Sequence, residues 1–248
     1  PVVSAPQTVI VSGADAGPDQ SICSGTEVTL SGNNTGVAGT WTPVSGQTGI
    51  SFADPTAYNT KATGLVSGQV YVFRWTLTGG ACPGSWDEVT VTYPPAIINT
   101  ITSATTIVCA GQTITITGDT PTGGNGTYTY QWQSSSDELT WANLAGKTAK
   151  DLSVTVTSTI YFRRVVTSNR CSTNSNEIQI TSLPAITNNT ISADQSICNG
   201  AIIAPLTGTL PTGADGTFVY QWQSSLNGTT WANIAGETSI NYSPPQPA

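Results

Sequence analysis

The clearest pattern along the chain is the alternation of β-branched or aromatic residues with polar ones in short runs. Between residues 96 and 184 these runs are separated by turns rich in Gly and Asn. A period of two predicts strands with one buried and one wetted face. The predicted strands are Thr113–Thr117, Tyr128–Ser134, Thr140–Leu144, Leu152–Thr155, Thr159–Thr167 and Glu177–Thr181. Regular short strands without any helical period predict an all-β fold built from antiparallel β-sandwiches.

Two stretches of the chain are nearly identical. Tyr128–Thr148 reads YTYQWQSSSDELTWANLAGKT, and about 90 residues later Phe218–Thr238 reads FVYQWQSSLNGTTWANIAGET. This spacing suits a small β domain better than a solenoid unit. Proline-containing boundaries then divide the chain into domain 1 (residues 1–95), domain 2 (96–184) and domain 3 (185–248). Because the linkers are short and stiffened by proline, we expect an elongated rod with limited bending.

The two ends of the chain are expected to be incomplete. The first dozen residues are interpreted as an opening strand or as a leftover strand of a preceding repeat. Domain 3 stops before its counterparts of Tyr161–Thr167 and Glu177–Thr181, which are the last two strands of the repeat. The missing strands should expose an edge beside Phe218–Ser224 and uncover the core. We therefore expect this chain to be a piece of a longer protein, or another strand to fill the gap.

Five cysteines occur, at positions 23, 82, 109, 171 and 198, and no two have the C-x-x-C spacing of a zinc or redox site. Cys23, Cys109 and Cys198 each begin a turn before a strand-like run, whereas Cys82 and Cys171 each precede a final run, DEVTV or NEIQI. This equivalence predicts one disulfide per complete domain, Cys23–Cys82 and Cys109–Cys171. Cys198 is left without a partner by truncation. The alternative is five reduced, buried thiols, whereas disulfides would indicate an oxidising, exported location.

The composition excludes several classes of function. The formal net charge is −7, and the seven basic residues are scattered except for the pair Arg163 and Arg164, which disfavours nucleic acid and anionic membrane surfaces. No apolar run is long enough to cross a bilayer. Histidine is absent, which removes Ser–His–Asp and Cys–His catalysis and the commonest zinc ligand. We expect no catalytic residue, cofactor or metal site.

Exposed tryptophans are the main candidates for ligand contact. Trp86, Trp141 and Trp231 are candidate glycan-binding residues, since a flat aromatic face can stack on a sugar ring. Packing at the core or rim of the sandwich is the competing interpretation, and we prefer it for these three as for Trp41 and Trp75. Among Trp41, Trp75 and Trp86, we expect Trp86 to be the exposed one.

The acidic residues favour structural roles. Asp15, Asp19 and Asp194 near domain starts suggest calcium at the junctions. Domain 2 carries Thr105 at the equivalent position of Asp19 and Asp194, so turn capping is the better interpretation. The adjacent pairs Asp87-Glu88 and Asp137-Glu138 point to opposite sides of a strand or hairpin, which disfavours acid–base catalysis. The Gly-rich segment 123–126 is predicted to be an ordinary loop.

Several motifs together resemble a known class of repeats. They are AGPDQSIC (Ala16–Cys23), FRWTLTGGAC (Phe73–Cys82), DEVTV (Asp87–Val91), YQWQSS (Tyr130–Ser135) and TWANLAG (Thr140–Gly146). They are similar to the tandem PKD-like and Ig-like repeats of very large surface adhesins in Bacteroidetes-type bacteria. Gliding-motility adhesins delivered by type IX secretion are the nearest of these. Trp132 also resembles the buried Trp on the third strand of an immunoglobulin-like sandwich.

The resemblance implies a non-enzymatic, extracellular segment of a bacterial cell-surface adhesin that serves attachment, gliding motility or both. Its partners would be neighbouring repeats of the same chain and surface polysaccharide or other surface proteins, with no direct membrane insertion. The alternative is a glycan-binding accessory module, including an accessory region of a secreted polysaccharide-degrading enzyme.

Overall fold

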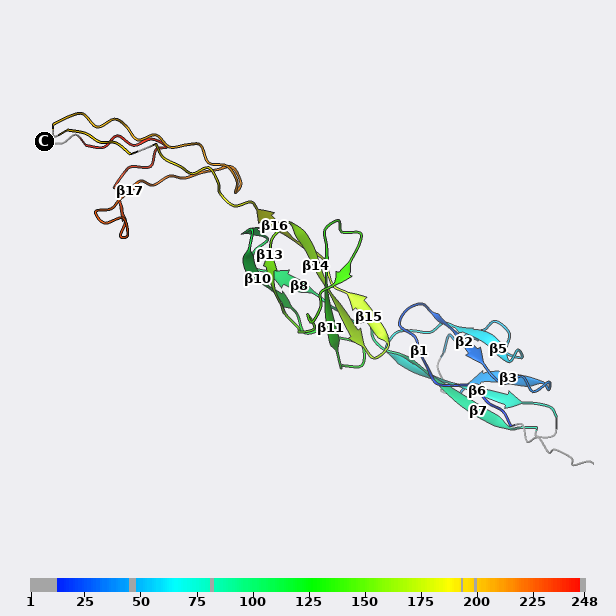
Figure 1. Cartoon of the computed structure of the whole chain (residues 1–248). Helices are drawn as coiled ribbons and strands as arrows, with labels where there is room; N and C mark the ends of the chain where they lie inside the picture. The colour runs from blue at the N-terminus through cyan, green and yellow to red at the C-terminus, as the bar shows by residue number, and fades with distance from the viewer. Residues whose placement is uncertain (1–12, 45–47, 81–82, 193, 199, 246–248) are drawn as a thin grey trace, which may run out of the picture.

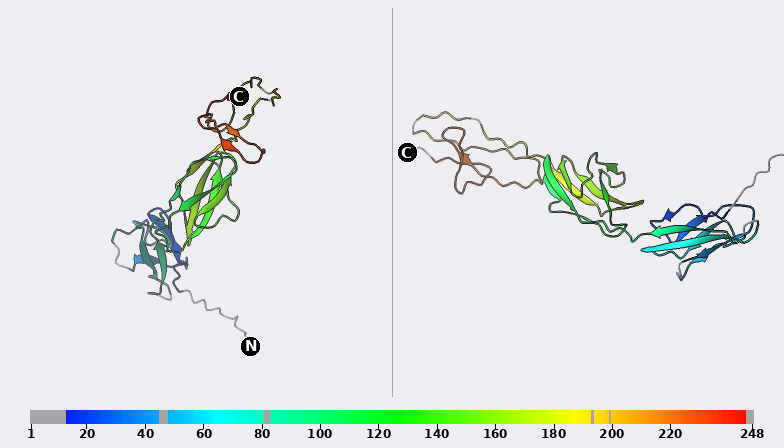
Figure 2. Two further views of the ribbon diagram at one scale, coloured as in Figure 1. Left: turned by 90° about the vertical axis from the view of Figure 1, so that its left-hand side faces the viewer. Right: turned by 90° about the horizontal axis from the view of Figure 1, so that it is seen from below.

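A computed structural model describes residues 13–44, 48–80, 83–192, 194–198 and 200–245 of the chain. Every regular element within these residues is a β-strand, so the predicted all-β class is confirmed. Figure 1 shows the strands gathered in two sandwiches and a third, more open body, which follow one another in a row. Figure 2 shows the same extended arrangement from two further directions. Domain 1 and domain 3 therefore lie at opposite ends of the molecule.

Domain 1 consists of two sheets that share one core. The larger sheet has the order β1-β7-β6-β3 and contains β1 (Gln20–Ser21), β7 (Trp86–Tyr93), β6 (Gln69–Leu77) and β3 (Gly39–Pro43). The smaller sheet has the order β2-β5-β4 and contains β2 (Glu27–Ser31), β5 (Asn59–Thr63) and β4 (Ser51–Phe52). Inward residues of β6 alternate with outward ones, which places Phe73 and Trp75 in the core. Trp75 packs on Trp41 with ring centroids 5.2 Å apart.

Domain 2 repeats this plan. One sheet has the order β13-β10-β8 and contains β13 (Leu152–Val156), β10 (Gln112–Gly118) and β8 (Ile101–Ser103). The other has the order β12-β11-β14-β16-β9, with β12 (Ala142–Asn143), β11 (Thr129–Ser135), β14 (Ile160–Ser168), β16 (Ile178–Leu183) and β9 (Ile107–Cys109), and β15 (Cys171–Asn174) pairs with β14. Trp132 is fully buried at the centre of the core, beside Phe162 and Ile116.

The predicted strands of domain 2 correspond to β10, β11, β13, β14 and β16 with shifts of one or two residues at their ends. The predicted strand Thr140–Leu144 is too long, because only Ala142–Asn143 pairs as β12. Thr140 instead belongs to the preceding turn, where its backbone N–H donates to Asp137. The short strands β8, β9 and β15 were not predicted from the sequence.

Domain 3 is more open than the other two. Its regular strands within the described residues are β17 (Gln223–Ser224) and β18 (Ala232–Asn233), which pair as the ends of β11 and β12 do. Isolated bridges join Thr187 to Thr212, Ile191 to Gly208 and Leu206 to Tyr242. The described part of domain 3 has no counterpart of β14, β15 or β16. Trp222, the counterpart of the fully buried Trp132, is accordingly only half-buried.

Candidate functional site

The junction between domains 1 and 2 contains a disulfide bond. Cys23 lies just beyond β1 in domain 1, and Cys171 is the first residue of β15 in domain 2. Their Cα atoms are 5.3 Å apart, although 148 positions separate them in the sequence. Cys171 is buried, whereas Cys23 is exposed. The bond therefore joins two domains and not two strands of one sandwich.

This connection differs from the predicted one. The structure pairs Cys23 with Cys171, so the predicted bonds Cys23–Cys82 and Cys109–Cys171 are wrong. Cys109 is a free, exposed thiol, and so is Cys198. Cys82 lies outside the described residues. The sequence shows which cysteines have equivalent positions in successive domains. It does not show whether a disulfide joins two cysteines of one domain or cysteines of two neighbouring domains.

Strand directions explain why Cys109 and Cys171 do not meet. β9 runs parallel to β16, so Cys109 pairs with Leu183, where the chain leaves for domain 3. β14 runs antiparallel to β16 and ends at Ser168, which pairs with Cys171 in the following hairpin. The two cysteines of domain 2 consequently lie at opposite poles of the sandwich. The alternation in the sequence shows which residues share a face of a strand. It does not reveal that β9 pairs in parallel with β16, and this pairing determines at which end of the sandwich Cys109 lies.

A glycine-rich loop holds the linker of this junction in place. Gly124 N donates to Pro95 O at 2.8 Å, and Asn125 N donates to Ser168 Oγ at 2.9 Å. The linker is thereby tied to the end of β14, next to Cys171. Gly123 has a φ of 81°, and a Cβ there would overlap the carbonyl of Ala96. The predicted loop at 123–126 is therefore a structural part of the junction.

A buried arginine lies in the core of domain 2. Arg164 is fully buried, and its guanidinium donates to Asn99 Oδ1 at 2.8 and 3.0 Å, to Lys150 O at 2.9 Å and to Asp119 O at 2.8 Å. Burial lowers the pKa of this guanidinium, while Tyr130 and two aspartates favour its charged form. In the sequence, Arg164 stands out only as half of a basic pair. The regular alternation along β14, in which Phe162, Arg164 and Val166 face the same side, is the signal that places Arg164 in the core.

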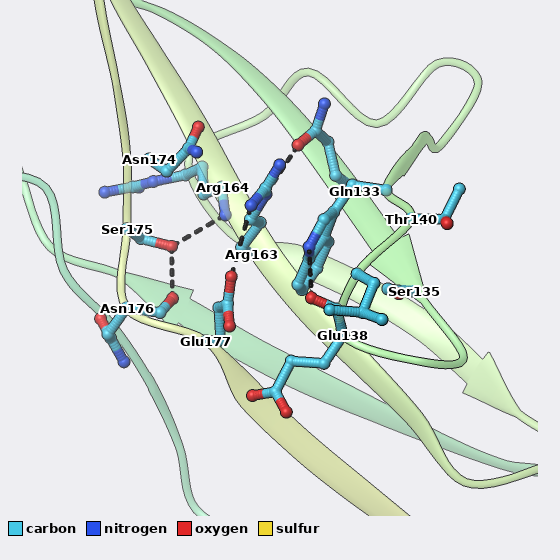
Figure 3. A network of polar contacts seen from close by, with 12 residues as sticks. Gln133, Ser135, Glu138, Thr140, Arg163, Arg164, Asn174, Ser175, Asn176 and Glu177 are labelled. Atoms are coloured by element: carbon cyan, nitrogen blue, oxygen red, sulfur yellow. Dashed lines mark hydrogen bonds and ion pairs between the residues drawn. The ribbon is translucent and has the colours of Figure 1, made fainter.

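The neighbouring Arg163 points to the opposite face of the sheet. Figure 3 shows it between Gln133 and Glu177, with distances of 2.8 and 3.3 Å to the respective side-chain oxygens. The guanidinium carbon also lies 4.1 Å from the centroid of the Trp141 ring. Arg74 in domain 1 is arranged similarly, with Glu88 at 2.6 Å and the Trp86 ring at 4.2 Å. Each sandwich thus presents a Trp ring covered on one face by an arginine.

The three candidate tryptophans differ in exposure. Trp86 is 55% exposed and Trp231 is 57% exposed, whereas Trp141 is half-buried. The indole N–H of Trp141 donates to Glu138 O at 3.2 Å. The three side chains belong to three different domains, so the structure does not bring them together. Trp41 and Trp75 are core residues, as predicted.

The acidic candidates have local partners. Asp15 accepts a hydrogen bond from Gly17 N and caps a turn, as predicted, whereas Asp19 accepts from Thr90 N on β7. Asp87 accepts from Ala16 N, while Glu88 pairs with Arg74. Asp194 is exposed. Within the described ranges, no three His, Cys, Asp or Glu side chains gather in a way that could hold a metal ion.

None of the elements in the described part of the chain is a helix long and apolar enough to cross a membrane. No curated protein matches the sequence significantly.

Several solved structures match the chain with low sequence identity. The four N-terminal Ig domains of Dscam1 isoform 6.9 match with 13% identity and a TM-score of 0.31. This match covers 66% of the present chain and 42% of the Dscam1 chain. Murine CEACAM1b matches with 13% identity and a TM-score of 0.37, covering 65% of this chain and 95% of that one. The fibronectin(III)-like modules of Clostridium thermocellum CbhA match with 14% identity and a TM-score of 0.37, covering 68% and 94%.

Two family models match the sequence. Residues 16–93 match the model described as K319L-like, PKD domain. Residues 98–184 and residues 187–247 each match the model described as domain of unknown function DUF8696. The second model therefore occurs twice in tandem and covers more than half of the chain. The protein belongs to the DUF8696 family, with a PKD-like domain preceding its two copies.

Proposed function

We propose that the chain is a non-enzymatic stalk segment of a large bacterial cell-surface adhesin, exported by type IX secretion and used in attachment, gliding motility or both. The PKD-like domain and the tandem Ig-like repeats support this proposal, because such domains typically have no catalytic role. The disulfide supports an extracellular location. The partners of the segment are neighbouring repeats of its own chain, and surface polysaccharide or other surface proteins at its tip.

The observation that carries the proposal is the disulfide across the junction of domains 1 and 2. A force applied along the rod passes from Cys23 directly to Cys171 through the S–S bond. The intervening backbone, which forms most of both sandwiches, then bears none of this force. Such shielding suits a spacer that holds its length under tension at a cell surface.

Single-molecule stretching of the chain from its two ends tests this mechanical role. The disulfide encloses a loop with a sequence separation of 148. At about 3.4 Å per extended residue, the oxidised chain should stop roughly 500 Å short of the length reached after reduction. The variant Cys171→Ser should reach the longer length without reductant, while Cys198→Ser, which alters an unpaired thiol, should behave as wild type. Equal lengths before and after reduction would contradict the proposal.

A glycan-binding accessory module is the second candidate, and the exposure of Trp86 favours it. Arg74 covers one face of this ring, and the side chain is still 55% exposed. A glycan array compares wild type with Trp86→Ala and with Val66→Ala, which removes an apolar side chain that is 62% exposed. Specific binding that only Trp86→Ala abolishes would favour this second function. We expect no specific binding from the stalk.

A further inference from the structure

The open face of domain 3 has the same local framework as the closed core of domain 2. Trp222 N donates to Glu237 O at 3.0 Å and its indole N–H donates to Ser239 O at 2.9 Å. Trp132 makes the equivalent two bonds, with Lys147 O at 3.0 Å and Ala149 O at 3.0 Å. Trp132 is fully buried, whereas Trp222 is only half-buried. The framework of domain 3 is therefore in place, but the strands that pair beside it in domain 2 have no counterpart in the described part of domain 3.

A cavity lies beside the segment of domain 3 that corresponds to β11. It has a volume of about 600 Å³, and its lining includes Gly208, Phe218, Tyr220, Trp222, Trp231 and Ile240. In domain 2 the equivalent surface is covered by β14, which pairs with β11 over seven residues, from Thr129–Thr167 to Ser135–Tyr161. The cavity thus has the place and the lining expected of a groove for a strand of the β14 type.

The groove also specifies one side chain of that strand. In domain 2, the absence of a Cβ at Gly118 leaves room for the Arg164 guanidinium, which also contacts the Lys150 carbonyl and lies 5.0 Å from the Tyr130 ring. Domain 3 has Gly208, Ile240 and Tyr220 at these three positions, and all three line the cavity. Domain 1 instead has Trp75 at the position of Arg164, and Gly39 makes room for its ring. Because Tyr220 occupies the position of Gly39, the groove of domain 3 favours an arginine.

The junction between domains 2 and 3 repeats the geometry of the first junction. Ser21 pairs with Thr92 in domain 1, and Ile107 pairs with Thr181 in domain 2; each pair is followed two residues later by a cysteine. Cys109 therefore has the same register relative to its linker as Cys23.

The second linker is also held as the first one is. Ala214 N donates to Pro184 O at 2.9 Å, as Gly124 N does to Pro95 O. Gly213 has a φ of 97°, and a Cβ there would overlap the Ala185 carbonyl, as one at Gly123 would overlap that of Ala96. The shared hydrogen bond and the shared glycine indicate that domain 3 has the same position relative to Cys109 as domain 2 has relative to Cys23.

We propose that the groove of domain 3 binds a β-hairpin of the β14–β15 type, and that the cysteine at its turn forms a second inter-domain disulfide with Cys109. The hairpin carries an arginine that enters the space above Gly208 and a cysteine seven positions later, as Arg164 and Cys171 are spaced. Successive domains of the repeat are then linked by one disulfide per junction. This inference depends on the repeat architecture and is independent of attachment or motility.

The bond forms by thiol–disulfide exchange with a low-molecular-weight disulfide such as oxidised glutathione. The Cys109 thiolate attacks one glutathione sulfur, and one glutathione thiolate leaves. The thiolate of the hairpin cysteine then attacks the Cys109 sulfur of this mixed disulfide, and the second glutathione thiolate leaves. The two cysteine protons go to solvent, the two cysteines lose two electrons, and the glutathione disulfide is reduced to two thiols.

An extended version of the full chain tests the proposal. Because the repeat spacing aligns Ala248 with Ser158, residues 159–183 of the same sequence are appended directly after Ala248. The chain is oxidised with the glutathione couple, and its disulfides are mapped by non-reducing peptide mass spectrometry. We expect two disulfides, which are the original bond between Cys23 and Cys171 and a new bond between Cys109 and the appended cysteine. Alkylation of Cys109 in the native state should fall at least about tenfold relative to the unextended chain, since only a free thiolate reacts.

Two controls separate the groove from the disulfide. An extension whose cysteine is replaced by serine should still cover the groove and shift the tryptophan emission to shorter wavelength, while Cys109 remains reactive. Replacing the arginine of the extension with glutamate should prevent the shift, because a carboxylate cannot donate to the carbonyl of Ile240, which has the position of Lys150 in domain 2. The proposal is overturned if the extension covers the groove but Cys109 stays free, or if Cys109 bonds to a cysteine of the original chain. It is also overturned if the unextended chain closes its groove by forming a dimer, measured by light scattering.

Discussion

At the scale of single residues, the cores of domains 1 and 2 solve the same packing problem differently. Trp75 and Arg164 occupy equivalent inward positions, two residues after Phe73 and Phe162. The tryptophan packs against Trp41 with the two rings tilted by 38°, whereas the arginine donates its hydrogen bonds to carbonyl and amide oxygens. A buried charge is tolerated only when its donors are satisfied. Arg164 should therefore be among the least replaceable residues of domain 2.

The variant Arg164→Met tests this dependence. It removes the donors to the carbonyls of Lys150 and Asp119 and leaves the buried Asn99 Oδ1 without its donor, so the free energy of unfolding of domain 2 should fall by about 3 kcal/mol. Urea titration monitored by amide hydrogen exchange in β11 and β14 measures the loss. Arg163→Met, which removes a partly exposed ion pair and a ring contact, should cost about 1 kcal/mol or less. Similar losses in both variants would show that burial of the charge is not the determining factor.

At the scale of elements, the turn between β11 and β12 is defined by one carboxylate. Asp137 accepts hydrogen bonds from Thr140 N at 2.8 Å, from the Ser135 hydroxyl at 2.8 Å and from Leu139 N at 3.0 Å. These donors lower the pKa of Asp137 from 3.8 to about 2. In domain 3, Asn227 accepts from Thr229 N and Thr230 N in the equivalent turn. An amide oxygen thus performs the same role without titrating.

Acidification should loosen this turn in domain 2. Because the pKa is lower in the folded state, the stabilisation is fully present above the unfolded value near 3.8 and is lost as the pH falls through about 2. We expect the protection factors of the Leu139 and Thr140 amides, measured by NMR and corrected for the intrinsic exchange rate at each pH, to fall in this window. The variant Asp137→Asn should keep its protection factors constant over the same range. Protection factors that do not change with pH in wild type would argue against the assigned cause.

The strands that the sequence predicts well are those with several alternating residues on a buried face. β10, β11, β13, β14 and β16 fulfil this condition, and their bounds agree with the alternation within one or two residues. β8, β9 and β15 span three or four residues, too few for a period of two to be recognised. The parallel pairing of β9 with β16 is set by contacts distant in sequence, and no local pattern encodes it. This pairing fixes the poles of the cysteines, which is why the predicted disulfides failed while the predicted sandwich was confirmed.

At the scale of the whole molecule, the repeat defines both the shape and the connections. The elongated arrangement in Figure 1 follows from short proline-containing linkers, each held by a loop of the following domain. The equivalence of Trp132 with Trp222 and of Gly118 with Gly208 could be read from the sequence. The groove beside Trp222 could be found only in the structure, because its depth depends on which strands are absent from the sheet. The buried position of Arg164 is the intermediate case, since alternation along β14 implies it once the strand is known.

The bond between Cys23 and Cys171 also changes what a protease can do to this rod. Hydrolysis of any single peptide bond between these two cysteines leaves both fragments in one covalent molecule. Exposed loops in this region, such as the one that carries Leu139, can therefore be nicked without release of the distal part. Where hydrolytic enzymes are abundant, such a molecule keeps its two ends joined after its first cut.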